Sequence, residues 1–204
     1  QILTKIFIQI LFFFILLLYM KYLISTIKGR DIEYNRTYNR LIELGVSKNN
    51  IIIDYGYLHS DVPHLKKDFH LLLYKFLNNI IPTMIKLNED LVYLEDNIYP
   101  LEKVEDIDIN KNNINWLGFI FNHKDYICGN KYVYFPLEVL LDINKNKDKI
   151  KNQHFDRFIK NYAEKNNILT INKNYIKLYR SVSCWGTDTQ KERKQKLKEK
   201  LFID

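Results

Sequence analysis

Apolar runs and segments of helical period alternate along the first half of the chain. The segments 21–27, 49–56 and 90–97 each contain a short run of β-branched, aromatic or leucine residues, which is typical of buried strands. Between them, the segments 29–46 and 64–81 place apolar residues at helical spacing. Strands that alternate with helices predict right-handed crossovers and a mostly parallel sheet. We therefore expect an α/β fold, a three-layer sandwich of the Rossmann-like kind around a mostly parallel central sheet.

Three details make this prediction specific. The first helix should end at Gly45, because glycine is the residue that most often follows the last helical turn. Two further strands are expected at 113–121 and 131–136. The strand from Leu91 to Leu94 should be central because its apolar run is uninterrupted, and Glu95 should then lie at its carboxyl end.

An apolar segment precedes the first predicted strand. Residues Ile6 to Met20 contain one polar residue, Gln9, and lysines flank the run. The run is shorter than the ~20 residues that cross a bilayer, although the following residues could extend it, and no small-residue cleavage site follows it. Two interpretations stay open for residues 1–19: a single N-terminal signal anchor, or a leader outside the folded domain.

Composition limits the functional classes. The 204 residues, 47% of them hydrophobic, suffice for one domain with a substantial core. A net charge of +7 and a pI near 9.1 favour anionic partners, but the abundance of Lys, Asn, Ile and Tyr is the bias that AT-rich codons produce. The two cysteines have neither the number nor the spacing of a disulfide framework or zinc site. The absence of a Walker loop, a Gly-rich dinucleotide turn and a Gly-x-Ser-x-Gly elbow disfavours NTPases, Rossmann dehydrogenases and α/β-hydrolases.

Two acids and an amide follow the predicted central strand. Glu95, Asp96 and Asn97 would emerge where open α/β sheets bind ligands, at the carboxyl ends of their strands. Their oxygens would suit a hard divalent cation, Mg²⁺ or Mn²⁺, that bridges to the phosphates of a nucleotide. The alternative is a solvated acidic turn.

The order of these elements resembles that of a known family. The opening strand "KYLISTIKGRD", the helix that ends in "LGV" and the strand that runs into "LEDN" are similar to glycosyltransferase family 25, the lipooligosaccharide and procollagen-type sugar transferases. "INWLGF" resembles that family's apolar strand ending in Leu-Gly-aromatic, and "HFDRFIKNYA" followed by "SVSCWGTDTQ" resembles its closing helix and tail. The likeness covers about residues 20–190, which we expect to form a transferase domain of the GT-A type, followed by a basic tail at 191–204.

The resemblance implies roles for individual residues. Glu95 and Asp96 would stand where the family holds its metal and ribose-phosphate ligands. At Asn97 an amide replaces the family's last acid, so it can still ligate but adds no charge to hold the cation. On the first strand and just beyond it, the residues placed to meet the donor's base and phosphates are Tyr22, Ser25, Thr26, Lys28 and Arg30. Ordinary strand residues followed by a basic loop are the alternative.

A sugar transfer also needs a group that takes a proton from the acceptor or stabilises the transition state. The candidates are Asp156, ahead of Asp188, with His154 as a possible neighbour; a surface charge in a first helical turn is the alternative role of Asp156.

The predicted function is sugar transfer from a nucleotide-diphosphate donor to a glycan, lipid or protein acceptor, as in lipopolysaccharide biosynthesis, in the cytoplasm or at a membrane. The basic tail could lie on an anionic membrane surface. Two alternatives stay open: a transferase-like domain without catalysis, for which Asn97 is the argument, and a small basic module that holds single-stranded nucleic acid, which is the less favoured partner.

Overall fold

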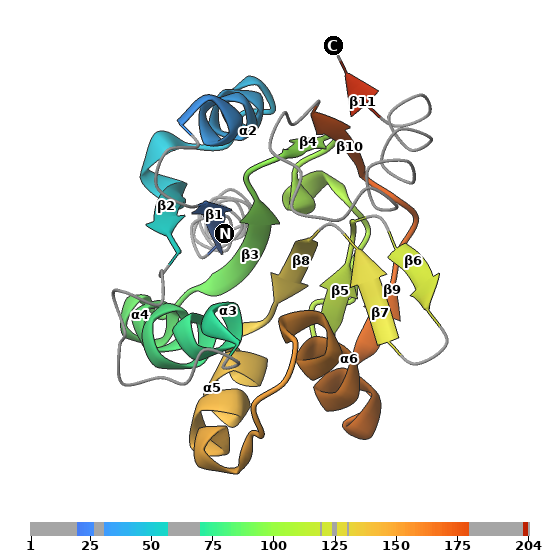
Figure 1. Ribbon diagram of the computed structural model, residues 1–204. Helices are drawn as coiled ribbons and strands as arrows, with labels where there is room; N and C mark the ends of the chain where they lie inside the picture. The colour runs from blue at the N-terminus through green and yellow to red at the C-terminus, as the bar shows by residue number, and fades with distance from the viewer. Residues whose placement is uncertain are drawn as a thin grey trace, which may run out of the picture.

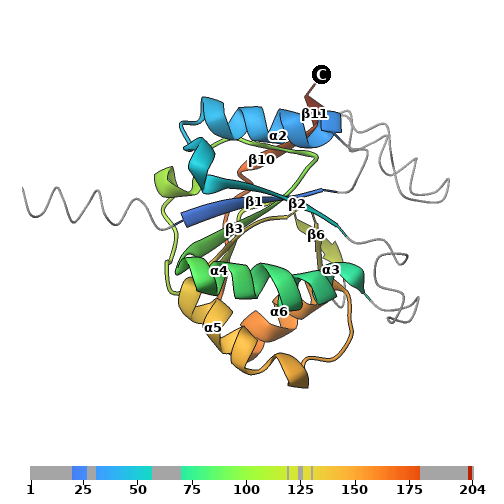
Figure 2. The same cartoon turned by 90° about the vertical axis from the view of Figure 1, so that its left-hand side faces the viewer.

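The chain folds into three layers. The computed structural model describes residues 20–26, 31–56, 70–118, 120–123, 126–129, 131–179 and 202–203. Figure 1 shows a central sheet with helices around it, and Figure 2 shows helix α2 on one face and helices α3, α4, α5 and α6 on the other. The predicted three-layer α/β sandwich is therefore confirmed.

The central sheet has six strands in the order β2-β1-β3-β8-β5-β9. Strand β1 lies parallel to both β2 and β3, and β5 lies parallel to β9. Strand β8 is antiparallel to both of its neighbours, β3 and β5. Their bounds are β1 Met20–Thr26, β2 Ile51–Tyr55, β3 Asp90–Glu95, β5 Ile114–Trp116, β8 Tyr132–Phe135 and β9 Leu169–Ile171. The run from Leu91 to Leu94 is central and Glu95 ends its strand, as predicted.

Helix α2 ends where the sequence predicted, whereas the second predicted helix, at 64–81, continues beyond Ile81 to Leu87. Helix α2, Asp31–Glu43, is followed by Gly45 at φ 85°, a left-handed conformation that glycine adopts without steric cost, which confirms the predicted end. Helix α3, Leu71–Lys75, continues through a π-helical turn, Phe76–Ile80, into α4, Ile81–Leu87. The remaining helices are α5, Leu137–Lys145, and α6, Phe155–Lys165, and short 3₁₀ turns occupy 48–50, 104–106 and 147–149.

One predicted strand is divided in the structure. The segment 113–121 was expected to be continuous, but β5 ends at Trp116, and Ile120–His123 forms β6 in a separate hairpin with β7, Tyr126–Gly129. A third small sheet contains β4, Ile98–Pro100, β10, Ile176–Tyr179, and β11, Phe202–Ile203. The apolar pattern continues through Leu117 because that side chain is also buried, so the pattern could not show where the strand ends.

The two faces of the sheet bury separate apolar clusters. Alternate strand residues point to opposite faces. Tyr22, Ile24, Val92 and Leu94 pack with Leu41 of α2 on one face. On the other face, the strand residues Leu23, Leu91, Tyr93, Val133 and Phe135 pack with helix residues that include Phe76, Phe155 and Phe158. A polar residue at the end of a strand is therefore directed either toward α2 or toward the α3–α6 layer.

None of the helices within the described ranges is both long and apolar enough to traverse a lipid bilayer. The apolar segment at 1–19 and most of the basic tail lie outside the described residues, so the predictions for both stay predictions.

Candidate functional site

The carboxyl ends of three parallel strands meet at one edge of the sheet. In the register of these strands, Ser25 of β1 is paired with both Asp54 of β2 and Glu95 of β3. The antiparallel strand β8 begins at the same edge, and Lys131 immediately precedes it. Polar side chains from four strands therefore gather where open α/β sheets bind ligands.

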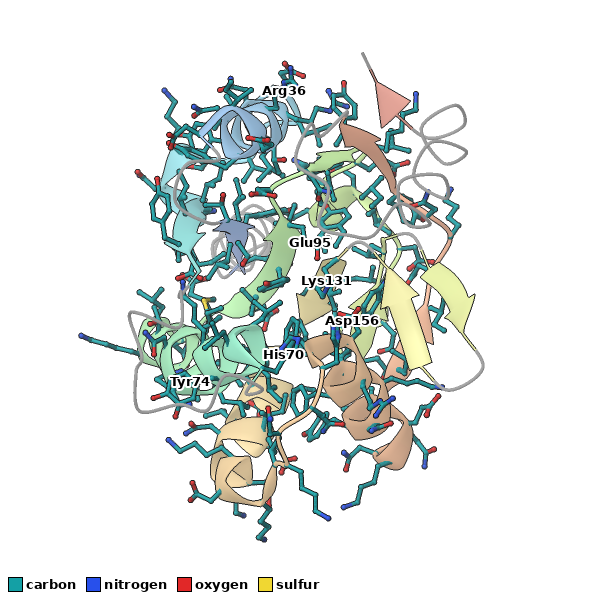
Figure 3. All side chains as sticks on the ribbon, viewed as in Figure 1. Arg36, His70, Tyr74, Glu95, Lys131 and Asp156 are labelled. Atoms are coloured by element: carbon teal, nitrogen blue, oxygen red, sulfur yellow. The ribbon has the colours of Figure 1, made fainter. Side chains whose placement is uncertain are left out.

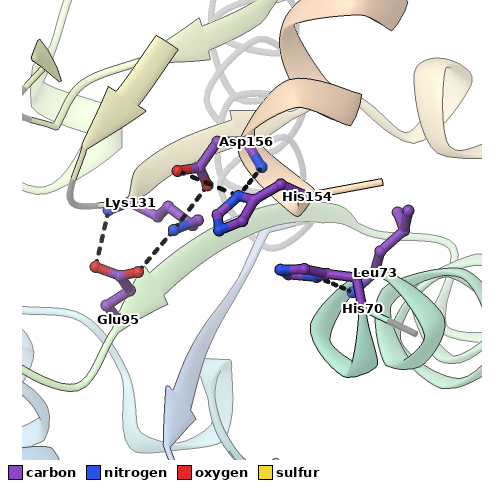
Figure 4. Close-up of polar contacts among 6 residues, drawn as sticks. All are labelled: His70, Leu73, Glu95, Lys131, His154 and Asp156. Carbon is purple, nitrogen blue, oxygen red and sulfur yellow. Dashed lines mark hydrogen bonds and ion pairs between the residues drawn. The ribbon is translucent and has the colours of Figure 1, made fainter. Parts of the chain in front are cut away.

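Lys131 is the centre of this edge and bridges two carboxylates. Its Nζ lies 2.8 Å from Glu95 Oε1 and 2.8 Å from Asp156 Oδ1 (Figures 3 and 4). Its backbone N–H also donates to Glu95 Oε2 at 3.3 Å. The side chains of Lys131 and Asp156 are only 6% and 2% exposed, whereas Glu95 is 26% exposed. Glu95 is thus the member of the cluster with the most access to solvent.

The two carboxylates keep Lys131 charged. Burial alone would lower the pKa of its ammonium group, but the negative charges of Glu95 and Asp156, together with their hydrogen bonds, raise that pKa above its ordinary value. Lys131 is therefore a fixed cation at neutral pH, and one negative charge of the three-residue cluster remains uncompensated.

Two histidines whose rings are in contact lie beside the cluster. His70 and His154 have ring centroids 4.4 Å apart, and each accepts a backbone N–H at the start of a helix through Nδ1: Leu73 for His70 and Asp156 for His154, both at 3.4 Å (Figure 4). Burial, and then the charges of His154 and Lys131, lower the pKa of His70 to about 4. His70 is accordingly neutral at pH 7.

A second buried ion pair lies on the same side of the sheet. Lys75 Nζ is 2.7 Å from Asp54 Oδ2, with a Lys75 side chain that is 4% exposed. Lys75 immediately precedes the π-helical turn, a feature that often occurs at functional sites. Burial raises the pKa of the Asp54 carboxyl even though Lys75 opposes the shift.

Asp96 points to the opposite face of the sheet from Glu95. Its carboxylate is buried, and Oδ2 accepts a hydrogen bond from Thr26 Oγ1 at 2.7 Å. The hydroxyl of Thr37 in α2 donates to the backbone carbonyls of Asp96 and Ile98, both at 2.8 Å. Asp96 and Thr26 therefore hold the turn after β3 against β1 and α2.

The expected metal ligands do not converge. Both oxygens of Glu95 contact Lys131, the carboxylate of Asp96 lies under α2, and Asn97 Oδ1 is buried without a hydrogen-bond partner among the described residues. Within the described ranges, no group of three or more His, Cys, Asp and Glu side chains is arranged to hold a metal ion. The three side chains are therefore not arranged to hold one Mg²⁺ or Mn²⁺ together.

The predicted donor-binding residues have different environments. Tyr22 is fully buried and its hydroxyl donates to Glu105, so it belongs to the core under α2. Thr26 is engaged by Asp96, and Ser25 lies next to the buried hydroxyl of Tyr93 near the cluster. Lys28, Arg30 and Asp188 lie outside the described residues, and their roles stay predictions.

Sequence reasoning missed an aromatic surface at the same edge. Tyr55 ends β2 with 47% of its surface exposed, and its ring meets that of Tyr34 edge-on at a centroid distance of 6.2 Å. Thr26 pairs with Tyr55 in the register of β1 and β2, so the aromatic surface shares the edge with Ser25. The signal in the sequence was a tyrosine at the end of a predicted strand.

Comparisons with known proteins support the fold. Neither a protein-family model nor a curated protein sequence matches this chain. Among solved structures, the chain is similar to a glycosyltransferase involved in the glycosylation of the major capsid of PBCV-1, with a TM-score of 0.51 and 15% sequence identity. The match covers 88% of this chain and 98% of that chain. This chain therefore shares the fold of a glycosyltransferase over nearly all of that enzyme's length.

Proposed function

We propose that the protein is a glycosyltransferase that binds a nucleotide-diphosphate sugar at the carboxyl edge of its sheet and transfers the sugar to a glycan, lipid or protein acceptor. The observation that carries the proposal is the cluster of Glu95, Lys131 and Asp156 at this edge. It coincides with the position where a sheet of this topology binds ligands. The shared fold with the capsid glycosyltransferase supports the same class of donor.

The roles of individual side chains follow from their exposure. Tyr55 presents a ring to solvent beside the end of β1, where it can stack on a nucleotide base. Glu95 is the carboxylate that faces the substrate, because Asp156 is buried behind Lys131. Asp156 was predicted to take the acceptor's proton; its burial favours a positioning role, in which it holds Lys131 and the start of α6. The narrower resemblance to family 25 and the GT-A type is part of this proposal.

A panel of nucleotide sugars tests the proposal directly. Thermal unfolding would be followed with UDP-glucose, UDP-galactose, UDP-N-acetylglucosamine and GDP-mannose, each with EDTA and with MnCl₂. A donor at about 100 times its dissociation constant adds ~2.7 kcal/mol to the free energy of unfolding, which raises the midpoint by several degrees. Free glucose is the control ligand, and it should cause no shift. A panel in which no donor raises the midpoint would contradict the proposal.

A donor that binds then separates an active transferase from an inactive one. Hydrolysis of the bound donor to the nucleoside diphosphate, measured with and without acceptor glycans, should be detectable for the wild-type chain and reduced in Glu95→Gln. Glu164→Gln is the matched control, because Glu164 is an exposed acid of α6 that pairs only loosely with Lys160, at 3.8 Å. Binding without any turnover would identify a transferase fold that retains the donor but not the reaction.

A further inference from the structure

We infer that this site binds its donor without a divalent cation, because the ammonium group of Lys131 already lies between the two carboxylates that a metal would otherwise bridge. The inference rests on the proposed function and specifies what its site requires. The observation behind it is the disagreement between the acidic run Glu95-Asp96-Asn97, which resembles a metal motif, and the contacts of its members.

The backbone itself prevents the acidic run from acting as one ligand set. Glu95 and Asp96 are consecutive at the end of β3, so their side chains leave opposite faces of the sheet. Glu95 points toward the layer of α3–α6, where Lys131 meets it, and Asp96 points toward α2, where Thr26 meets it. Replacing Asn97 with an acid would not bring Glu95 and Asp96 to a common cation, because the divergence comes from the pleat of the strand.

Lys131 occupies the position between carboxylates that a cation would take. Its Nζ lies 2.8 Å from Glu95 Oε1 and 2.8 Å from Asp156 Oδ1, and its side chain is only 6% exposed. A divalent ion approaching the same two carboxylates would meet a fixed positive charge that burial screens poorly. Lys75 compensates Asp54 in the same manner on the same side of the sheet. The repulsion between carboxylates and diphosphate that makes a metal necessary is thus reduced by lysines of the chain itself.

The first experiment measures the metal alone. MnCl₂ would be titrated into the ligand-free protein by isothermal titration calorimetry, with Mn²⁺ electron paramagnetic resonance as a second readout. The wild-type chain should bind no Mn²⁺ at this edge. Lys131→Met, which leaves two facing carboxylates without their cation, should gain Mn²⁺ affinity by roughly tenfold or more. Lys75→Met is the matched control: it removes a buried lysine that pairs with Asp54 outside the Glu95–Asp156 cluster, and its affinity for Mn²⁺ should change little.

The outcomes decide the inference even if a variant fails to fold. Mn²⁺ binding by the wild-type chain that is lost in Glu95→Gln or in Asp156→Asn would overturn it. Circular dichroism would show whether the Lys131→Met protein is unfolded. In that case the titration of the wild-type chain alone decides the inference. Absence of wild-type binding, together with gain in Lys131→Met, supports the inference.

The second experiment measures the donor. The dissociation constants of the nucleotide sugars that shift the unfolding midpoint would be compared in EDTA and in MnCl₂. Equal constants in both buffers support metal-independent binding, and binding that requires MnCl₂ overturns it. A panel in which no donor binds in either buffer would contradict the proposed function, and the Mn²⁺ titration would still decide whether the acidic run holds a metal.

Discussion

At the scale of single residues, adjacent acids have different tasks. Glu95 contacts the buried Lys131 and is 26% exposed to solvent. Asp96 is 3% exposed and accepts a hydrogen bond from the hydroxyl of Thr26. Buried polar groups are stabilised by hydrogen bonds, so the bond between Asp96 and Thr26 contributes to the stability of the fold. The consequence is that a substitution at Asp96 changes stability before it changes ligand binding.

We expect Asp96→Ala to lower the free energy of unfolding by about 1–3 kcal/mol, because it removes a buried carboxylate that accepts a hydrogen bond from the Thr26 hydroxyl. Urea denaturation of the purified variant measures this. Asp106→Ala is the matched control. Asp106 is 57% exposed, and its ion pair with Lys103 is long, at 3.8 Å, so its loss should change the free energy of unfolding by less than ~0.5 kcal/mol. Wild-type stability combined with a loss of Mn²⁺ binding in Asp96→Ala would instead make Asp96 a metal ligand.

Tyr55 is the residue that we expect to contact the base of the donor. Tyr55→Ala should weaken binding of the donor's nucleoside diphosphate by about 1 kcal/mol or more, since it removes a stacking surface for the base. Tyr55→Phe keeps the ring and should bind like the wild-type chain. Calorimetric titration of the three proteins with UDP or GDP, whichever matches the donor found, measures the difference. Equal affinity of Tyr55→Ala and Tyr55→Phe would place the base elsewhere.

At the scale of elements, two helix starts share one histidine pair. His70 precedes α3 and His154 precedes α6, and their rings lie 4.4 Å apart with a tilt of 58° at the edge of the sheet that carries Lys131. Because each ring accepts a backbone N–H through Nδ1, each must leave that nitrogen unprotonated to form this bond. Because burial lowers the pKa of His70, the start of α3 is sensitive to acid.

We expect the free energy of unfolding to fall as the pH is lowered from about 6.5 toward about 4. In this window the unfolded chain, with His70 at its ordinary pKa of 6.5, binds a proton that the folded chain, with a pKa of about 4, does not. His70→Asn offers a non-titrating N-cap and should flatten this dependence while keeping stability at pH 7. Urea unfolding at pH 7 and pH 5 measures both proteins. An unchanged difference between the two pH values in His70→Asn would contradict the assignment.

At the scale of the whole molecule, a net charge of +7 is compatible with a transferase and with a module that binds nucleic acid. Within the described residues, several basic side chains are committed to ion pairs: Lys21, Arg40, Lys75, Lys103, Lys131 and Lys160. Each pair joins one positive and one negative charge, so the pairs leave the net charge unchanged, but these basic side chains are engaged by carboxylates and are less available to a phosphate backbone.

We expect a labelled oligothymidine to bind only at low salt, by non-specific attraction, and to be lost by about 0.15 M salt. Fluorescence anisotropy across a salt series measures this, and a labelled heparin fragment is the matched polyanion. The nucleic-acid module would be favoured by two results together: an affinity for oligothymidine at physiological salt that exceeds the affinity for heparin, and no binding of any nucleotide sugar.

The sequence alone was enough to predict the first three strands of the sheet, the end of the first helix and the edge where a ligand site should lie. The apolar runs predicted β1, β2 and β3, Gly45 predicted the end of α2, and Glu95 was correctly placed at the end of the central strand. These features are local, because hydrophobic period and helix-ending residues act within a few positions of the chain. Asp156 was selected as a site residue, although its contacts could not be foreseen.

Only the tertiary structure decided which side chains meet. Lys131 is brought to Glu95 by the antiparallel pairing of β8 with β3, and to Asp156 by the docking of α6, contacts that span 36 and 25 residues of sequence. His70 and His154 come together in the same way. The pleat of β3 separates Asp96 from Glu95, although the two are neighbours in the sequence. The packing of distant segments decides strand register, helix docking and the face on which a side chain emerges. Composition and local hydrophobic period could therefore predict the edge of the sheet, but not the ion pairs that form there.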